Sequence, residues 1–408
     1  MSDITQKNKK FDLIIWGSTG YTGKLVCEYI FKKYKDTNLK WALGGRNKYK
    51  LESLISFLNL KSIPHFVAES NNKSSLLKLT KMTNTICSTV GPYDKYGTLL
   101  VEACIESKTN YCDITGETHW IRKIIDNYHA KAQKNKVKII HACGFDSIPS
   151  DLGVFYAQNK MKENTGKYAN KISMRVSAMK GGVSGGTIHS FLNILKQSRK
   201  SKSIRKIINN PQSLSQNSGL INVNEIDLKK IIYDTNCKAW IGPFVMASIN
   251  TRIVRRSNSL FDFKFGKDFS YNEAVIIGKG KFSKFLGYFR YIPIILVSKI
   301  KNKIFNSLLR LILPKSGEGP TENSRNSGYF KFRFYVFNKK IKAIASVSGN
   351  GCPGYGSTSK MLAETSICLA LDKLPDESGV LTPSVGLGSK LLNRLEKNAG
   401  LKFEIKFL

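Results

Sequence analysis

The feature that most constrains the fold of this chain is a glycine-spaced segment close to its first residue. Residues 11–16 form a short apolar run, three glycines follow at the spacing G-x-x-G-x-x-G, and an amphipathic run comes next. Gly17 allows a tight turn off a strand, Gly20 lets a phosphate approach the backbone, and Gly23 lets a helix pack closely on that strand. The order strand, loop, helix predicts a dinucleotide site with the pyrophosphate at the helix N-terminus.

The second apolar run indicates which dinucleotide binds. Residues 39–43 read as a strand that ends in Gly44, Gly45 and Arg46, with no acidic residue nearby. A site for NAD usually places Asp or Glu at this strand end, where it binds the ribose 2′-hydroxyl and repels a 2′-phosphate. The guanidinium of Arg46 instead offers a planar set of donors to a phosphate. The alternative is that Arg46 is an ordinary exposed basic residue. Because no acid follows this strand and Arg46 does, we predict NADP as the cofactor.

Strand-like and helix-like runs alternate through the first 150 residues, which predicts an α/β fold with a Rossmann doubly wound parallel sheet. Ligands bind such sheets at the carboxyl ends of the strands, so we place cofactor contacts in the first loop and after the fourth strand. The expected strands are 11–16, 39–43, 64–68, 84–90, 110–114 and 136–142, and the expected helices 22–35, 47–58, 73–80, 95–107, 117–134 and 149–160. The predicted contacts are Gly17, Ser18, Thr19, Gly20, Tyr21, Thr22, Gly23, Arg46, Ser88, Thr89, Val90, Gly91, Pro92 and Tyr93.

The pattern changes further along the chain, and at 408 residues two domains are the default. Strand-like runs at 171–179, 274–278, 329–337 and 341–347 suggest a second α+β domain with an antiparallel sheet, the last two runs forming a hairpin. We therefore predict a cofactor domain at 1–150 and a substrate or dimerisation domain at 151–350. Residues 351–408 should form a C-terminal helix and strand that close onto these domains.

Composition indicates the cellular compartment of the protein and the kinds of partner that it can bind. The eight cysteines form no C-x-x-C pair and have no histidine at zinc-ligand spacing. We therefore expect reduced, mostly buried thiols in a cytoplasmic protein, and no metal site. The first ten residues are polar and no run of 18 apolar residues occurs, so we expect neither a secretory signal nor a membrane span. The formal net charge of +36 indicates either an anionic partner or the amino-acid usage of a lysine-rich proteome, without a function.

The basic charge is concentrated in residues 279–315, which hold nine Lys and Arg and no acid. Aromatic and aliphatic residues are interleaved with these charges, and Ile300, Ile304, Leu308 and Leu311 share one helical face. Such a composition is typical of a helix lying in an anionic membrane interface. A helix that covers the second domain or forms a dimer contact is the alternative. We predict peripheral membrane association and no nucleic-acid partner.

Several motifs resemble the saccharopine dehydrogenase-like oxidoreductases, and within them the trans-acting enoyl reductase branch. The similarity runs over nearly the whole chain, and the blocks at 111–117 and 143–153 are more specific than the glycine loop. It implies an NADP-binding Rossmann domain, a saccharopine-reductase-like second domain, and a role in lipid or glycolipid metabolism at membranes, but it does not fix the substrate. The matching segments are 17–23, 89–93 with Tyr96 and Gly97, 111–117, 143–153, 181–187, 317–320, Gly354-Tyr355 and 381–383.

This reading predicts an NADPH-dependent enoyl or carbonyl reductase that acts on lipid-linked or acyl substrates. Tyr96 is the leading proton donor, and Asp146 is a second candidate for catalysis. A helix cap is the alternative role for Asp146. His141, at the end of the sixth expected strand, is a further candidate, and a core histidine is its alternative role. Two other functions stay open, a saccharopine-type amino-acid imine reductase and a non-catalytic NADPH-binding membrane-associated protein. A homodimer is expected by analogy alone.

Overall fold

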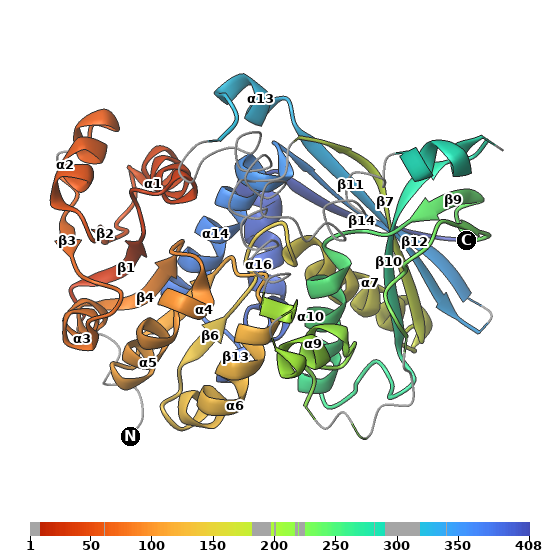
Figure 1. Cartoon of the computed structure of the whole chain (residues 1–408), viewed down its shortest axis with the longest axis horizontal. Helices are drawn as coiled ribbons and strands as arrows, with labels where there is room; N and C mark the ends of the chain where they lie inside the picture. Colours follow the sequence, from red (N-terminus) through yellow and green to blue (C-terminus); the bar gives the residue numbers. More distant parts are fainter. Residues whose placement is uncertain are drawn as a thin grey trace. The chain divides into compact units, whose positions relative to one another are not determined.

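The computed structural model describes residues 9–60, 62–181, 197–199, 201–216, 219, 225–280, 282–289, 319–339 and 341–408 (Figure 1). The chain divides into two compact units, and each is built from two stretches of sequence. The first unit comprises Met1–Ile148 and Gly354–Leu401, and the second comprises Pro149–Pro353 and Lys402–Leu408. Most of the stretch expected to form a separate C-terminal segment therefore belongs to the first unit.

The first unit contains a parallel sheet of seven described strands, in the order β13-β6-β5-β4-β1-β2-β3. This arrangement confirms the predicted doubly wound fold and all six strands expected from the sequence. The strands are β1 (Phe11–Trp16), β2 (Trp41–Gly45), β3 (His65–Val67), β4 (Thr83–Ser88), β5 (Asn110–Asp113), β6 (Lys138–Ile140) and β13 (Gly379–Leu381).

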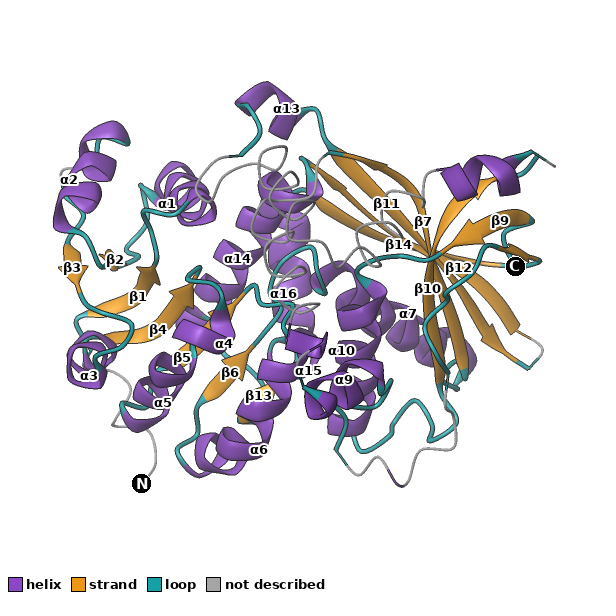
Figure 2. Ribbon diagram, viewed as in Figure 1, coloured by secondary structure: helices purple, strands orange, loops and turns teal. Residues whose placement is uncertain are grey.

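Helices cover both faces of this sheet (Figure 2). One layer contains α3 (Lys73–Lys81), α5 (Thr98–Glu106) and α6 (Thr118–Lys134), which pack on β4, β5 and β6. The other layer contains α1 (Tyr21–Tyr34), α14 (Thr358–Leu371) and α16 (Gly388–Arg394). The remaining elements are α2 (Lys48–Phe57), α4 (Tyr93–Tyr96), α15 (Pro383–Gly386) and the π-helix η3 (Leu395–Ala399).

The C-terminal part of the first unit completes its sheet. Helix α14 packs on β1, β4, β5 and α1, and β13 then pairs with β6 as a seventh strand. Eleven of the fourteen residues of α14 are buried, including Glu364, so its sequence lacks the polar outer face of a surface helix. A strand of three residues such as β13 carries too little pattern to be predicted from sequence.

The second unit contains a sheet of seven described strands, in the order β14-β12-β11-β7-β10-β9-β8. The prediction of an antiparallel sheet is wrong in one respect, because β7 and β10 pair in parallel. The chain between them includes α10 (Ala247–Leu260), which packs on β10 and lets that strand run in the same direction as β7. The strands are β7 (Lys171–Lys180), β8 (Ile232–Asp234), β9 (Ala239–Gly242), β10 (Ser270–Gly278), β11 (Tyr329–Asn338), β12 (Ile341–Asn350) and β14 (Leu401–Phe407).

The hairpin of β11 and β12 is confirmed. The helices of the second unit are α7 (Ile148–Thr165), α9 (Lys202–Asn209), α10 (Ala247–Leu260) and α13 (Glu322–Asn326), with the π-helix η2 (Pro353–Ser357) at its boundary. Residues 290–315 of the predicted basic segment, and the motif segments 182–187 and 317–318, lie outside the described residues. No helix in the described parts is long and apolar enough to cross a membrane. All eight cysteines are free thiols, and seven of them are buried.

Candidate functional site

The predicted site residues gather along one edge of the first unit's sheet. Strands β1, β2, β4, β5 and β6 are parallel, so the segments that follow them leave the sheet at the same edge. The glycine loop follows β1, Arg46 follows β2, the turn 89–93 follows β4, and Asp146 lies in the turn after β6. The fold therefore brings both groups of predicted cofactor contacts, and both catalytic candidates, to the edge where such sheets bind ligands.

The glycine loop has the geometry that the spacing predicts. Gly17 has a φ of +88°, a conformation that favours glycine, and its N–H donates to the carbonyl of Gly44 at 2.9 Å. The hydroxyl of Ser18 donates to the same carbonyl at 3.1 Å. Helix α1 then begins after Gly20 with no side-chain cap and no acidic residue in its first turn. A phosphate at this end of α1 would meet the positive end of the helix dipole.

The turn after β4 is held against the glycine loop. The hydroxyl of Thr89 donates to the carbonyl of Gly17 at 3.0 Å. Tyr93 is buried, and its hydroxyl donates to the carbonyl of Ser88 at 3.1 Å, so this side chain supports the turn from inside. A cis peptide bond joins Gly91 to Pro92. The turn presents Gly91, Pro92 and half-buried Thr89 and Val90 at its surface.

Arg46 is exposed directly beyond the end of β2, between that strand and the N-cap of α2. Its side chain has no hydrogen-bond or ion-pair partner among the described residues. No acidic side chain follows β2 before α2 begins at Lys48. The guanidinium therefore stands where a 2′-phosphate would be recognised in this type of fold.

The two catalytic candidates differ in their surroundings. Tyr96 is half-buried at the end of α4, and the ammonium of Lys95 lies 5.1 Å from its ring centroid. Asp146 is half-buried, forms no hydrogen bond with the described residues, and lies beside the turn that contains Gly116. Burial raises the pKa of Asp146 to about 7. Near neutral pH this carboxyl can therefore be protonated and donate a proton.

His141 is a core residue, in line with its structural alternative. Its Nδ1 lies 2.8 Å from Oδ2 of Asp113, and both side chains are buried. The hydroxyl of Tyr111 donates to the same carboxylate oxygen at 2.9 Å, and the N–H of Thr115 donates to the other at 3.0 Å. Asp113 is thereby fully engaged, and this pair stabilises the loop after β5.

Sequence reasoning missed a cluster formed by Asp94, Glu117 and His119. The Glu117 carboxylate accepts the N–H of Tyr93 at 2.9 Å and the N–H of Asp94 at 3.0 Å, so it caps α4 from the start of α6. Nε2 of His119 lies 3.8 Å from Oδ2 of Asp94. Asp94 lies in α4, and Glu117 and His119 lie at the start of α6. Asp94 and Glu117 are 23 positions apart, and no local spacing in the sequence indicates that they meet.

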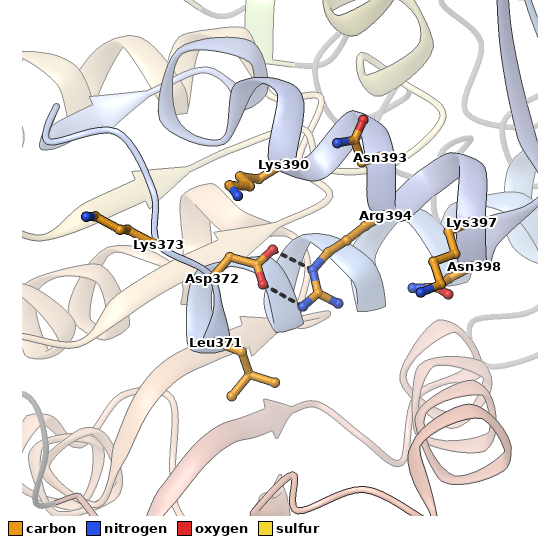
Figure 3. Close-up of a pocket in the computed structure, with 8 residues that line it drawn as sticks. All are labelled: Leu371, Asp372, Lys373, Lys390, Asn393, Arg394, Lys397 and Asn398. Carbon is orange, nitrogen blue, oxygen red and sulfur yellow. Dashed lines mark hydrogen bonds and ion pairs between the residues drawn. The ribbon is translucent and has the colours of Figure 1, made fainter.

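A separate pocket lies away from this edge, at the C-terminal end of α14 (Figure 3). It has a volume of about 420 Å³ and contains the paired side chains of Asp372 and Arg394. The other lining residues are Leu371, Lys373, Lys390, Asn393, Lys397 and Asn398. None of the predicted site residues lines it.

Comparison with known proteins identifies the family. The saccharopine dehydrogenase NADP-binding domain matches residues 13–140, which span β1 to β6. A Mycobacterium tuberculosis protein provisionally named as a trans-acting enoyl reductase is 33% identical over 407 residues, covering 96% of this chain and 97% of that protein. The trans-acting enoyl reductase of Mycobacterium bovis is 31% identical, with the same coverage.

The fold has a counterpart among solved structures. Saccharopine dehydrogenase (L-Glu forming) from Saccharomyces cerevisiae superposes with a TM-score of 0.55 at 10% sequence identity, over 97% of this chain and 99% of that one. The matched domain, the whole-length relatives and the shared fold agree with one another. The chain belongs to the saccharopine dehydrogenase-like oxidoreductases, in the branch of the trans-acting enoyl reductases, and is an NADP-dependent oxidoreductase.

Proposed function

We propose that the protein uses NADPH to reduce an enoyl or carbonyl group of a lipid-linked acyl substrate at an anionic membrane surface. NADPH, when bound, supplies the hydride. The names of the mycobacterial relatives support an enoyl substrate. The lipid part of the proposal is carried by one observation, an exposed aromatic helix in the second unit.

That helix comprises residues 283–289, at the start of the basic segment. Gly287 is buried, and a Cβ there would lie 2.7 Å from Ile277 and 2.8 Å from Ile231, so the helix is seated closely on the second unit. The apolar side chains on its other sides stay in solvent. The exposed residues are Phe282 (86%), Phe285 (64%), Leu286 (54%), Tyr288 (46%) and Phe289 (57%).

Phe285 and Phe289 contact each other edge to face, and an exposed apolar cluster of this kind marks an interaction surface. Its setting favours a membrane, because the segment 279–315 adds nine positive charges and no negative one. Lys284, within the helix, extends over Trp240 with its ammonium 5.1 Å from the ring centroid. Aromatic rings can enter the interface while the neighbouring lysines reach anionic headgroups.

The double substitution Phe285→Ser with Phe289→Ser should reduce binding to anionic vesicles by at least tenfold. Full burial of one such side chain contributes about 1.5–3 kcal/mol, and the pair loses both contributions. Flotation with phosphatidylglycerol-containing liposomes measures the effect. Phe57→Ser is the matched control, because Phe57 is 81% exposed on α2 outside this segment. Equal flotation of the double variant and the wild type, or no need for anionic lipid, would contradict the membrane proposal.

In the reductase reaction we assign the proton transfer to Asp146. Hydride addition leaves an electron pair on the substrate, and a protonated carboxyl at the carboxyl edge of the sheet can supply the matching proton. Its lack of a hydrogen-bond partner among the described residues leaves the carboxyl free to contact a substrate. Tyr96 is the other candidate, since its phenol can donate to an enolate or alkoxide.

The turnover rate should fall as pH rises through about 7, because the donor form of Asp146 is lost over that range. Asp146→Asn should lower kcat by about 10²- to 10⁴-fold and remove this decline. NADPH oxidation with an enoyl-acyl lipid measures both effects, and Tyr96→Phe provides the comparison. An Asp146→Asn enzyme with full turnover would exclude Asp146 as the proton donor. Loss of turnover in Tyr96→Phe alone would identify the phenol of Tyr96 as the donor instead.

Cofactor choice is assigned to Arg46. Arg46→Asp should weaken NADPH binding about 10- to 100-fold, the worth of a charge-assisted hydrogen bond, and should leave NADH binding unchanged or improved. Fluorescence titration with the two cofactors measures the ratio. Lys50→Asp gives the same change in net charge at another exposed position and should not alter that ratio. Equal effects of Arg46→Asp on both cofactors would remove the assignment.

A further inference from the structure

The cluster of Asp94, Glu117 and His119 has the composition and spacing of a metal-ligand set. Each residue offers one ligand atom, and these atoms all lie within 4.8 Å of one another. On a zinc ion the ligand distances are about 2.0–2.2 Å, which separates two ligand atoms by about 3.4 Å in tetrahedral geometry. Small side-chain rotations would therefore bring the three atoms onto one ion.

His119 is the member whose environment calls for a ligand. Its side chain is 8% exposed, and neither ring nitrogen has a hydrogen-bond partner in the described parts of the chain. A buried imidazole normally donates from one nitrogen and accepts at the other, because an unmet polar group costs free energy. Its Nε2 faces Oδ2 of Asp94 at 3.8 Å, beyond hydrogen-bond distance. A metal ion bound at Nε2 would give the imidazole a partner that the described residues do not supply.

The two carboxylates of the cluster also favour a bound cation. Glu117 is fully buried, and its carboxylate accepts two backbone hydrogen bonds. The Asp94 carboxylate adds further negative charge close to it. The two hydrogen bonds occupy one position on each Glu117 oxygen, and a carboxylate oxygen has a second lone pair for a metal. A cation would offset the negative charge that these two groups place in the protein interior.

We propose that Asp94, Glu117 and His119 form a binding site for one divalent transition-metal ion. An imidazole with two carboxylates favours Zn²⁺ and its neighbours over Mg²⁺, which prefers all-oxygen ligands and retained waters. The Asp94 side chain is 21% exposed, which gives the ion a route from solvent. The bound ion would link α4 to the start of α6. It would thereby stabilise the turn 89–93, which directly precedes Asp94. This site is independent of the proposed substrate.

The test uses the purified full-length protein, stripped with a chelator and dialysed. Calorimetric titration with zinc chloride should show one site per chain, and cobalt chloride should produce the visible absorption of a nitrogen- and oxygen-ligated ion. Asp94→Asn and His119→Gln should each weaken zinc binding at least about 10- to 100-fold, since loss of an outer partner alone costs that much. Zinc should also raise the melting temperature of the wild type and leave that of both variants unchanged.

His65→Gln is the matched control, because this half-buried histidine of β3 lies outside the cluster. It should bind zinc as the wild type does. Asp94→Asn keeps shape and volume at a partly exposed position, so it remains informative where His119→Gln folds poorly. The proposal is overturned by the absence of one-to-one binding, by unchanged binding in Asp94→Asn, or by a thiolate signature in the cobalt spectrum.

Discussion

Gly23→Ala is expected to bind NADPH at least tenfold more weakly than the wild type and to be less stable by about 1–3 kcal/mol. A Cβ at this position would lie 2.2 Å from the carbonyl oxygen of Gly17 and 2.9 Å from Cα of Ser18. Both atoms belong to backbone, so no side chain can rotate away. Helix α1 would have to move off β1, and the loop between them would lose the geometry that suits a pyrophosphate.

Gly20→Ala separates the two effects. A Cβ there meets a single atom within 4 Å, the carbonyl oxygen of Gly17 at 3.3 Å, and Gly20 is exposed. This variant should keep wild-type stability and still bind NADPH more weakly, because the methyl group would occupy the approach of the phosphate. Urea unfolding gives the stability, and fluorescence titration gives the binding. If Gly23→Ala matched the wild type in both measurements, the assigned role of the loop would be wrong.

Glu364→Leu should lower the free energy of unfolding by about 3–5 kcal/mol, the usual cost of removing one member of a buried charged network. Glu364 lies on α14 and is completely buried. It accepts the hydroxyls of Tyr29 and Tyr34 at 2.7 Å each, and Asn398 donates to it at 3.2 Å. Leucine would leave these donors without their acceptor inside the protein.

The neighbouring pair of Arg394 and Asp372 determines which contacts are lost when Glu364 is replaced. Arg394 holds Asp372 through two hydrogen bonds of 2.6 Å (Figure 3). It also donates to Glu364 at 3.4 Å. These contacts lower the pKa of Asp372 and raise that of Arg394. Since Arg394 keeps Asp372 when Glu364 is replaced, the loss measured is mainly that of the tyrosine contacts between α1 and α14.

Urea unfolding followed by circular dichroism measures the effect of Glu364→Leu. Glu377→Gln is the control, because Glu377 is exposed and its side chain forms no hydrogen bond with the described residues. It should change stability by less than about 0.5 kcal/mol. Equal stability of Glu364→Leu and the wild type would show that the network contributes no net stability. Replacement of buried charged groups by apolar residues is neutral in some proteins.

Local patterns predicted the first unit well because its signals are short-range. The strands β1 to β6 are buried apolar runs bounded by turns, and the glycine spacing places the loop between β1 and α1. Helix α10 of the second unit shows the limit of such patterns. Its sequence is polar, and it buries Arg252, Arg255 and Arg256, whose donors bind distant carbonyls such as that of Leu214. Polarity alone would place this helix at the surface.

The sequence by itself determined the doubly wound sheet, the phosphate loop and the absence of an acid after β2, because each depends on residues within one strand and its adjoining turn. Only the tertiary structure decided that α14 and β13 complete the first unit, and that β7 pairs in parallel with β10. It alone brought Asp94 to Glu117 and His119, and left Asp146 half-buried with no hydrogen bond to the described residues. These outcomes depend on burial and on contacts between distant segments, and neither quantity is encoded in local spacing.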